Sequence, residues 1–267
     1  MVHHIRVFGP IIREVYDAGQ PIVSRWGGPG IYASLSASCF GRVSLYSVVG
    51  PEFDGWGDLG SVDCSGVRVC PGWKTPTAYF RPDGSFALEQ ITVPPLDVHL
   101  MPFAGSTVLS SMHPKWLAAA LRSCAGSIVV LDSCGGWIEA FPREVMHAAS
   151  LANVVSLTSH EWMLWDRSIG RRPRCIRIEK RGADGVFVQD GSRVIGVPAP
   201  LCSRVISTIG CGDMLLGVLG ARLCGNTELS AENVAAACVD ATQVIGHWLQ
   251  ARDVSDFLAS SGLVRAD

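Results

Sequence analysis

The sequence has no charge bias, no long apolar run and no closely spaced pair of cysteines. Its 22 basic and 24 acidic side chains give a formal net charge of -2, so nothing predicts a surface that binds nucleic acid or an anionic membrane. No run of about 18 apolar residues could span a bilayer, and the amino terminus leads into an apolar strand instead of a signal sequence. We therefore expect a soluble, cytoplasmic protein.

Cysteines are frequent, but their spacing excludes two common roles. None of the ten belongs to a Cys-x2-Cys pair, the spacing typical of zinc and redox sites, and most stand in apolar surroundings. We expect free, buried thiols, with Cys211 alone placed to meet a ligand. Only three of the 22 basic residues are lysines, which we interpret as coding bias.

Short apolar segments alternate with helical sequence along most of the chain. With 267 residues and 48% hydrophobic content, the chain can bury a large core. Segments such as 128–132 and 154–157 have the composition of buried strands, which predicts an α/β fold with a mainly parallel sheet and helices on both faces. No repeat or long linker divides the chain, so we predict one domain over residues 1–267. Short β-type segments at 62–92 interrupt the alternation and predict a lid or an edge element.

Two glycines and a carboxylate fall where a loop turns into a helix. Residues 207–213 read Ser-Thr-Ile-Gly-Cys-Gly-Asp and precede the apolar run 214–219. The first turn of a helix offers unpaired N–H groups and the positive end of the dipole, which suit a phosphate. Asp213 would stand beside that anion and could accept the proton of a hydroxyl that attacks phosphorus. The alternative is an Asp that caps the helix after a flexible loop.

A second Gly-rich stretch, residues 26–30, opens another predicted helix. The pattern Gly-x-Gly-x-x-Ala at 28–33 matches the dinucleotide fingerprint, and Glu52 and Asp54 stand near the place of a ribose-binding acid. That fingerprint should join the first strand directly to its helix, whereas residues 10–25 intervene here. An NAD-dependent dehydrogenase is therefore the lesser alternative.

Two further carboxylates follow predicted strands. Glu14 comes after the first strand, and Glu161 comes after the strand at 154–157. The carboxyl ends of strands are where open α/β sheets place ligand contacts. Glu161 could either balance the dipole of a helix or act as a metal-linked carboxylate.

Several of these stretches together resemble the ribokinase-like carbohydrate kinases. Residues 207–213 are similar to the family signature Asp-Thr-x-Gly-Ala-Gly-Asp, and residues 27–50 resemble its Gly-Gly loop, small-residue helix and strand ending in Val-Gly. The pair Thr158-x-x-Glu161 is similar to the family's Asn-x-x-Glu, and residues 179–185 are similar to its Thr-x-Gly-x-x-Gly nucleotide loop. The matches run in the family's order from Ile5 to about Leu249.

The resemblance implies a ribokinase-like fold and a phosphoryl-transfer site. Asp213 would deprotonate the acceptor hydroxyl, and the N–H groups of Gly210, Cys211 and Gly212 would form an anion hole for the migrating phosphoryl group.

The resemblance also implies ATP and Mg²⁺ as cofactors. Thr158 and Glu161 would lie near the nucleotide, with Glu161 holding Mg²⁺ through water. Gly182 and Gly185 would let the backbone approach the nucleotide closely.

On the acceptor side, the resemblance places four residues. Gly27 and Gly28 would pack against the acceptor, and Glu14 stands where the family usually has an Asp that binds acceptor hydroxyls. Tyr32 replaces a substrate-binding Asn of ribokinases, so we expect a sugar, polyol such as inositol, or nucleoside other than plain ribose.

The sequence also departs from the family. Ser207 replaces an Asp that helps organise a monovalent-cation site in many relatives, which leaves a need for potassium open. Residues 10–25 are short for the family, so with 62–92 they imply a small, reduced β lid and leave a homodimer open. We predict a kinase that transfers the γ-phosphoryl group of ATP to a hydroxyl. The departures at Ser207 and Thr158 favour the alternative of a non-catalytic, ligand-binding regulator.

Overall fold

The computed structural model describes residues 3–16, 23–81, 86–89, 103, 105–226 and 228–260. Nine strands form the central sheet: β1 (His4–Phe8), β4 (Arg42–Val49), β5 (Asp63–Val69), β8 (Ser106–Leu109), β9 (Ile128–Asp132), β10 (Val154–Thr158), β11 (Ile176–Lys180), β12 (Val186–Asp190) and β13 (Arg193–Val197). Their order is β13-β12-β11-β10-β9-β8-β1-β4-β5. All neighbours from β5 to β11 are parallel, whereas β12 and β13 add an antiparallel hairpin. The predicted mainly parallel sheet is confirmed.

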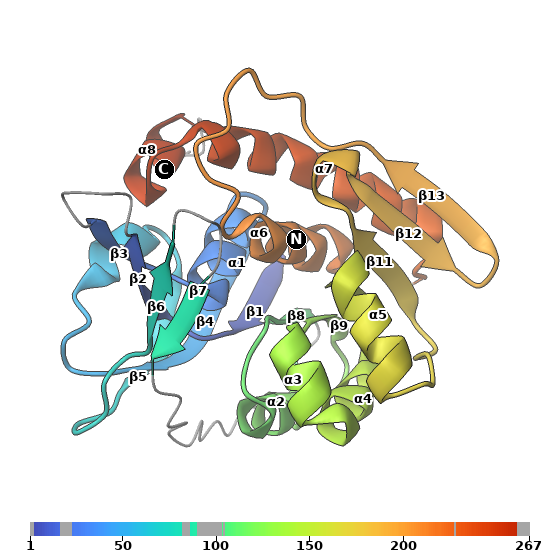
Figure 1. Cartoon of the computed structure of the whole chain (residues 1–267), viewed down its shortest axis with the longest axis horizontal. Coiled ribbons are helices and arrows are strands. Elements are labelled where there is room, and N and C mark those ends of the chain that lie inside the picture. The colour runs from blue at the N-terminus through green and yellow to red at the C-terminus, as the bar shows by residue number, and fades with distance from the viewer. Residues whose placement is uncertain are drawn as a thin grey trace.

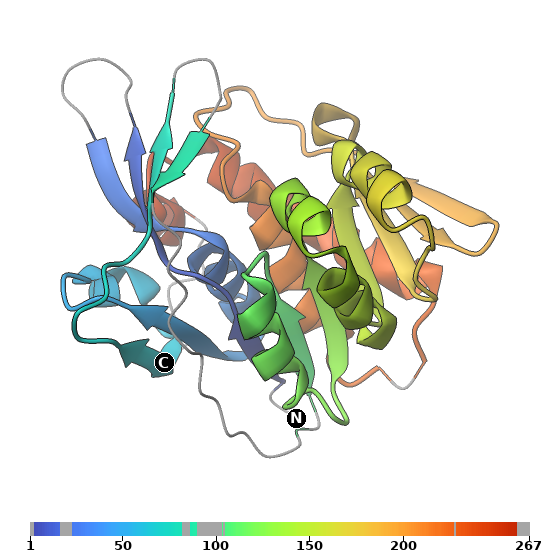
Figure 2. The same ribbon diagram turned by 60° about the horizontal axis from the view of Figure 1, so that its bottom comes forward.

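Helices cover both faces of this sheet, as Figures 1 and 2 show. One layer contains α1 (Pro29–Ser38), α6 (Cys211–Leu223) and α7 (Ala231–Gln250), and the other contains α2 (Pro114–Leu121), α3 (Gly135–Ala140), α4 (Pro142–Leu151) and α5 (Ser159–Ser168). Alternate strand residues supply the two cores, so Val154 packs in the core under the first layer and Val155 in the core under the second. The short helix α8 (Val254–Ser260) packs on α7. Among the described residues, no helix combines the length and the apolar character needed to cross a membrane.

A small second sheet has the order β3-β2-β6-β7 and stands apart from the main sheet in Figure 2. Its strands are β2 (Ile12–Tyr16), β3 (Val23–Gly27), β6 (Thr77–Phe80) and β7 (Phe86–Glu89). Strands β2, β6 and β7 fall within the two predicted lid ranges, and β3 extends two residues beyond 10–25. Of these ranges, 17–22, 82–85 and 90–92 lie outside the described residues. Strand β5 also lies within 62–92, but it belongs to the main sheet as the edge strand beside β4 and not to the small sheet. A short, half-exposed edge strand carries the same sequence pattern as a strand of a small separate sheet.

Helices α1 and α6 pack unusually close to one another because Gly217 has no side chain. A Cβ atom built on Gly217 would lie 2.1 Å from the carbonyl oxygen of Ala33 and 2.3 Å from Oγ of Ser36. The Ser36 hydroxyl also donates a hydrogen bond of 2.9 Å to the carbonyl of Met214. This contact fixes the start of α6 beside the start of α1.

We expect Gly217→Ala to destabilise the protein. The added methyl would overlap with the backbone of α1, and overpacking of this kind costs about 1–3 kcal/mol, more than the roughly 1 kcal/mol that Ala gains over Gly in a helix. Urea denaturation measures the free energy of unfolding. Gly57→Ala is the matched control, since no atom lies within 4 Å of its added Cβ. Equal stability of the two variants would contradict this account of the α1–α6 contact.

Candidate active site

The parallel strands end at a cavity of about 740 Å³. Asp132 ends β9, Lys180 ends β11, and both side chains line the cavity together with Gly210, Gly212 and Asp213 from the start of α6. The carboxyl edge of an open parallel sheet is where such folds bind ligands. The stretch at 209–213 therefore meets the carboxyl edge of the sheet.

The first turn of α6 presents unpaired amides to this cavity. Gly210 precedes the helix in the left-handed conformation, with φ of 84°, which a residue with a side chain rarely adopts. Among the described residues, the amides of Gly210, Gly212 and Asp213 have no acceptor. The amide of Cys211 donates to the carbonyl of Thr208 at 3.3 Å, and Cys211 packs against the core without lining the cavity. An anion would therefore meet the neighbouring amides and not that of Cys211.

Asp213 is the acid with the most unusual environment. Burial raises the pKa of its carboxyl group to about 8, repulsion from Asp132 and Glu14 adds to the increase, and the charge of Lys180 opposes it. A carboxyl group with a pKa near neutrality can take up a proton at physiological pH, which suits a general base.

Asp132 and Lys180 form a buried ion pair in the same cavity. The Nζ atom of Lys180 donates to Oδ2 of Asp132 at 2.6 Å, and their side chains are 14% and 7% exposed. Burial raises the pKa of Asp132 to about 6, although Lys180 lowers it, so the pair is charged at neutral pH. Neither residue was assigned a role from the sequence. Two features of the sequence could have indicated them: Asp132 ends an apolar strand, and Lys180 is one of only three lysines in the chain.

Thr158 and Glu161 form a capping box at the start of α5. Oε2 of Glu161 accepts hydrogen bonds from the amide and the hydroxyl of Thr158 at 2.7 and 2.9 Å, and its own amide donates back to Oγ1 at 3.2 Å. Glu161 lines the cavity, and its Oε1 has no hydrogen-bond partner in the described part of the chain. The helix-dipole interpretation of Glu161 is thus compatible with contact to a hydrated cation.

The residues present fit Mg²⁺ held mainly by a nucleotide. Carboxylate oxygen is the donor that Mg²⁺ prefers, and Glu161 offers one such oxygen at the cavity wall. The described residues contain no group of three or more His, Cys, Asp or Glu side chains that could hold a metal ion by themselves. Mg²⁺ usually keeps several waters and binds through one or two carboxylates plus substrate phosphates.

Glu14 is buried and already has four hydrogen-bond donors. Its Oε2 accepts from the hydroxyls of Tyr16 and Tyr32 at 2.5 and 2.6 Å and from Nε of Arg25 at 3.1 Å, while Oε1 accepts from the amide of Gly28 at 3.1 Å. Burial and the negative charge of Glu14 raise the pKa of Tyr32 well above its usual value, so this phenol stays a donor. The structure therefore brings together Glu14, Gly28 and Tyr32 at the cavity, with Arg25 as a partner that the sequence did not indicate.

The remaining predicted residues lie outside the cavity lining. Gly27 stands behind the wall, where an added Cβ would come within 2.4 Å of the Glu14 carboxyl group. Thr158 does not line the cavity itself, but its hydroxyl donates a hydrogen bond to Glu161, which does. Gly182 and Gly185 shape the turn between β11 and β12, where the amide of Gly185 donates to the carbonyl of Gly182 at 3.1 Å.

Large apolar side chains form the other wall of the cavity. They come from the small sheet and from segments near α2 and α3, and they include Phe80, Leu88, Met112, Trp116 and Trp137. Such a wall favours a ligand with an apolar face beside the charged end at Asp213.

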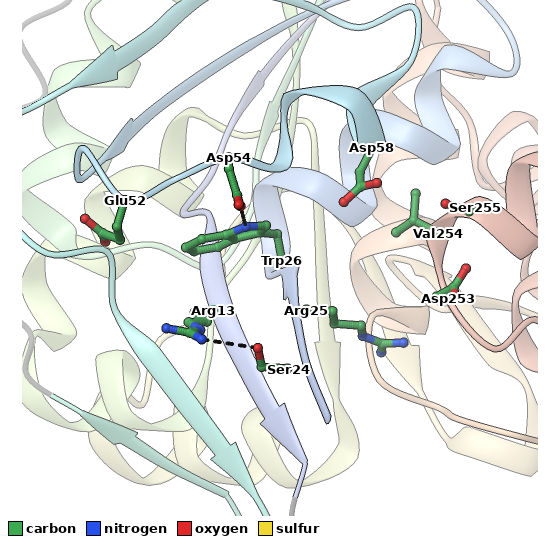
Figure 3. Close-up of a pocket in the computed structure, with 10 residues that line it drawn as sticks. All are labelled: Arg13, Ser24, Arg25, Trp26, Glu52, Asp54, Asp58, Asp253, Val254 and Ser255. Carbon is green, nitrogen blue, oxygen red and sulfur yellow. Dashed lines mark hydrogen bonds between the residues drawn. The ribbon is translucent and has the colours of Figure 1, made fainter. Parts of the chain in front are cut away.

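A second, smaller cavity of about 460 Å³ lies between the small sheet and α8 (Figure 3). Glu52 and Asp54 line it, and Asp54 accepts a hydrogen bond of 2.5 Å from the indole nitrogen of Trp26. The fingerprint glycines at 28–33 follow β3 of the small sheet and not β1 of the main sheet. The turn into α1 therefore does not start from a strand of the parallel sheet, as a dinucleotide site requires, which removes the support for the dehydrogenase alternative.

No model of a protein family matches the sequence, and no curated protein matches it. Solved structures do match the fold. A double mutant of Vibrio cholerae fructokinase, bound to fructose, ADP and potassium, has a TM-score of 0.77 and 18% identity over 95% of this chain and 94% of that chain. Salmonella enterica aminoimidazole riboside kinase, complexed with aminoimidazole riboside and an ATP analogue, has a TM-score of 0.75 and 18% identity over 93% and 94%.

A third structure carries the family name. The nucleoside kinase of Methanocaldococcus jannaschii, an archaeal member of the ribokinase family, has a TM-score of 0.72 and 14% identity over 94% of this chain and 93% of that chain. The chain therefore has the ribokinase-like fold that its motifs predicted.

We expect Arg25→Met to destabilise the protein strongly, because it leaves the Glu14 carboxylate buried without its cation. Removing one partner of a buried ion pair costs about 3–5 kcal/mol. The double variant Glu14→Gln, Arg25→Met should lose less stability than Arg25→Met alone, because no uncompensated charge remains. Urea denaturation of the three proteins measures this difference. A double variant as unstable as Arg25→Met would show that Arg25 acts by packing and not through charge.

Proposed function

We propose that the protein is an ATP-dependent kinase that transfers the γ-phosphoryl group to a hydroxyl of a sugar, polyol or nucleoside. The observation that carries this proposal is Asp213, an acid with a pKa of about 8, beside the unpaired amides of the first turn of α6 at the carboxyl edge of the sheet. A general base next to an anion site is the arrangement that phosphoryl transfer to an alcohol requires. The likeness to fructokinase, aminoimidazole riboside kinase and nucleoside kinase supports the same class of reaction.

In the proposed reaction, Asp213 takes the proton of the acceptor hydroxyl while the oxygen of that hydroxyl attacks the γ-phosphorus. The bond from this phosphorus to the β–γ bridging oxygen breaks, and ADP leaves with the electron pair. The amides of Gly210 and Gly212 stabilise the negative charge on the phosphoryl group during its transfer. Mg²⁺ held through water by Glu161 would neutralise charge on the phosphates when the nucleotide is bound.

The cavity wall supports an acceptor that carries an apolar face. Trp116 and Trp137 line the cavity with Phe80, whereas the hydrogen-bonding capacity of Glu14 is already taken up by donors of the protein itself. A nucleoside or a sugar with an apolar substituent would contact both walls. We further propose that residues 1–267 form a single domain in which the small sheet acts as a lid, since Ile12, Ala78 and Leu88 of this sheet line the cavity.

We expect Asp213→Asn to lower turnover by roughly 10²–10⁴-fold while nucleotide binding is largely retained, because an amide cannot accept the proton. ADP release measured across a panel of sugars, inositols and nucleosides identifies the acceptor and gives the rate. Asp190→Asn is the control, since it changes an exposed acid at the end of β12. Full activity of Asp213→Asn would refute the assignment of the base. Tight ATP binding without ADP release for any acceptor would favour the regulator instead.

The raised pKa of Asp213 predicts a pH dependence that can be measured without an acceptor. Its folded pKa of about 8 lies above the ordinary value of 3.8, so stability is fully present below pH 3.8 and is lost as the pH rises through about 8. Asp213→Asn does not show this loss of stability with rising pH, because its amide does not titrate. Its thermal midpoint should therefore exceed that of the native protein by an amount that grows from pH 5 to pH 8 and then levels off. With a known acceptor, kcat/KM should rise up to the same pH. A constant difference in midpoint would contradict the raised pKa.

A further inference from the structure

The ammonium group of Lys180 lies directly beside the anion-binding turn of α6. A Cβ atom built on Gly212 would be 3.2 Å from Nζ of Lys180. Gly212 therefore leaves open the space between this cation and the unpaired amides of the turn. Lys180 and Gly212 both line the 740 Å³ cavity, so the cation and the amides face the same ligand space.

Lys180 stays protonated, and its ammonium group has more N–H donors than its contact with Asp132 uses. Burial alone would lower the pKa of its amine, but attraction by Asp132 and Glu161 outweighs burial and raises it. An ammonium group has three N–H donors, and Asp132 is its acceptor at 2.6 Å in the part of the chain that the structure describes. Two donors thus remain for a ligand in the cavity.

We propose that Lys180 is a further catalytic residue, whose ammonium group binds the phosphoryl group during its transfer, and that Asp132 is the positioning residue that holds this ammonium group beside Gly212. The inference rests on the proposed kinase function. Lys180 stays protonated throughout, because the proton of the acceptor goes to Asp213 and the electron pair of the broken P–O bond leaves with ADP.

The ion pair with Asp132 explains how a base and a cation can share one cavity. Lys180 attracts Asp213 as well, and a direct ion pair between them would stabilise the carboxylate and weaken it as a base. The 2.6 Å bond to Asp132 holds the ammonium group on another carboxylate. Lys180 can then stabilise negative charge on the phosphoryl group while Asp213 remains available to the acceptor hydroxyl.

The test compares two variants at Lys180 with a surface control. Lys180→Met leaves Asp132 buried without its cation and could unfold, so the double variant Asp132→Asn, Lys180→Met is made as well to keep the pair neutral. Lys115→Met removes the same charge from an exposed position of α2. Calorimetry measures the binding of tripolyphosphate and of adenosine, and a steady-state assay measures kcat and KM for the acceptor.

We expect kcat of the double variant to fall by roughly 10²–10³-fold with a small change in KM, as for the loss of one donor to a developing anion. Tripolyphosphate should bind at least about 10-fold more weakly, adenosine should bind equally well, and Lys115→Met should match the native protein. A folded double variant that keeps kcat and tripolyphosphate affinity within about 3-fold overturns the proposal.

If the native protein phosphorylates no acceptor, the proposed function fails while the tripolyphosphate measurement still decides the role of Lys180. Binding by the native protein that is lost in the double variant supports the anion site. Equal binding by both proteins, or no binding by the native protein, overturns it.

Asp132→Asn alone tests the positioning role. It removes a negative charge near Asp213 and frees Lys180 to approach that base, so the acid limb of kcat/KM should move to lower pH by about one unit. An acid limb that does not move would overturn the assignment of Asp132.

Discussion

The close packing of α1 on α6 is the contact on which the arrangement of the site depends. It is possible because Gly217 lets the backbone of α6 approach Ala33, and it brings the starts of both helices to one end of the sheet. There the ring of Tyr32 lies where a side chain on Gly210 would be, with the indole of Trp248 behind it at 5.1 Å between ring centroids. The geometry of the first turn of α6 is therefore a consequence of core packing and not of the loop alone.

The cavity gathers more carboxylates than cations, and the pairing among them decides which acid has the most strongly raised pKa. Arg25 neutralises Glu14, and Lys180 neutralises Asp132. Asp213 has no cation of its own, which is why burial and the neighbouring negative charges raise its pKa to about 8. Asp213 is thus left with the more strongly raised pKa, whereas the pKa of Asp132 beside Lys180 rises only to about 6.

Local signals in the sequence predicted much of the fold and part of the site. The alternation of apolar segments with helical sequence predicted the parallel sheet, and the residues at 210–213 predicted an anion-binding helix start that does face the cavity. Each of these signals lies within a few neighbouring residues. The sheet that β5 joins and the role of Arg25 could not be predicted in this way, because both are set by the pairing of one strand with another.

Asp132 and Lys180 are 48 residues apart, and no local pattern links them. The order of the strands in the sheet links these two residues. β10 lies between β9 and β11, with Ser156 in register with Asp132 and Thr158 in register with Lys180. Ser156 and Thr158 are two residues apart in one strand, so Asp132 and Lys180 must point to the same face of the sheet, across β10 from one another. The face is the one that α6 covers. The missing information was therefore the position of β10 in the sheet, from which both the ion pair and its place under α6 follow.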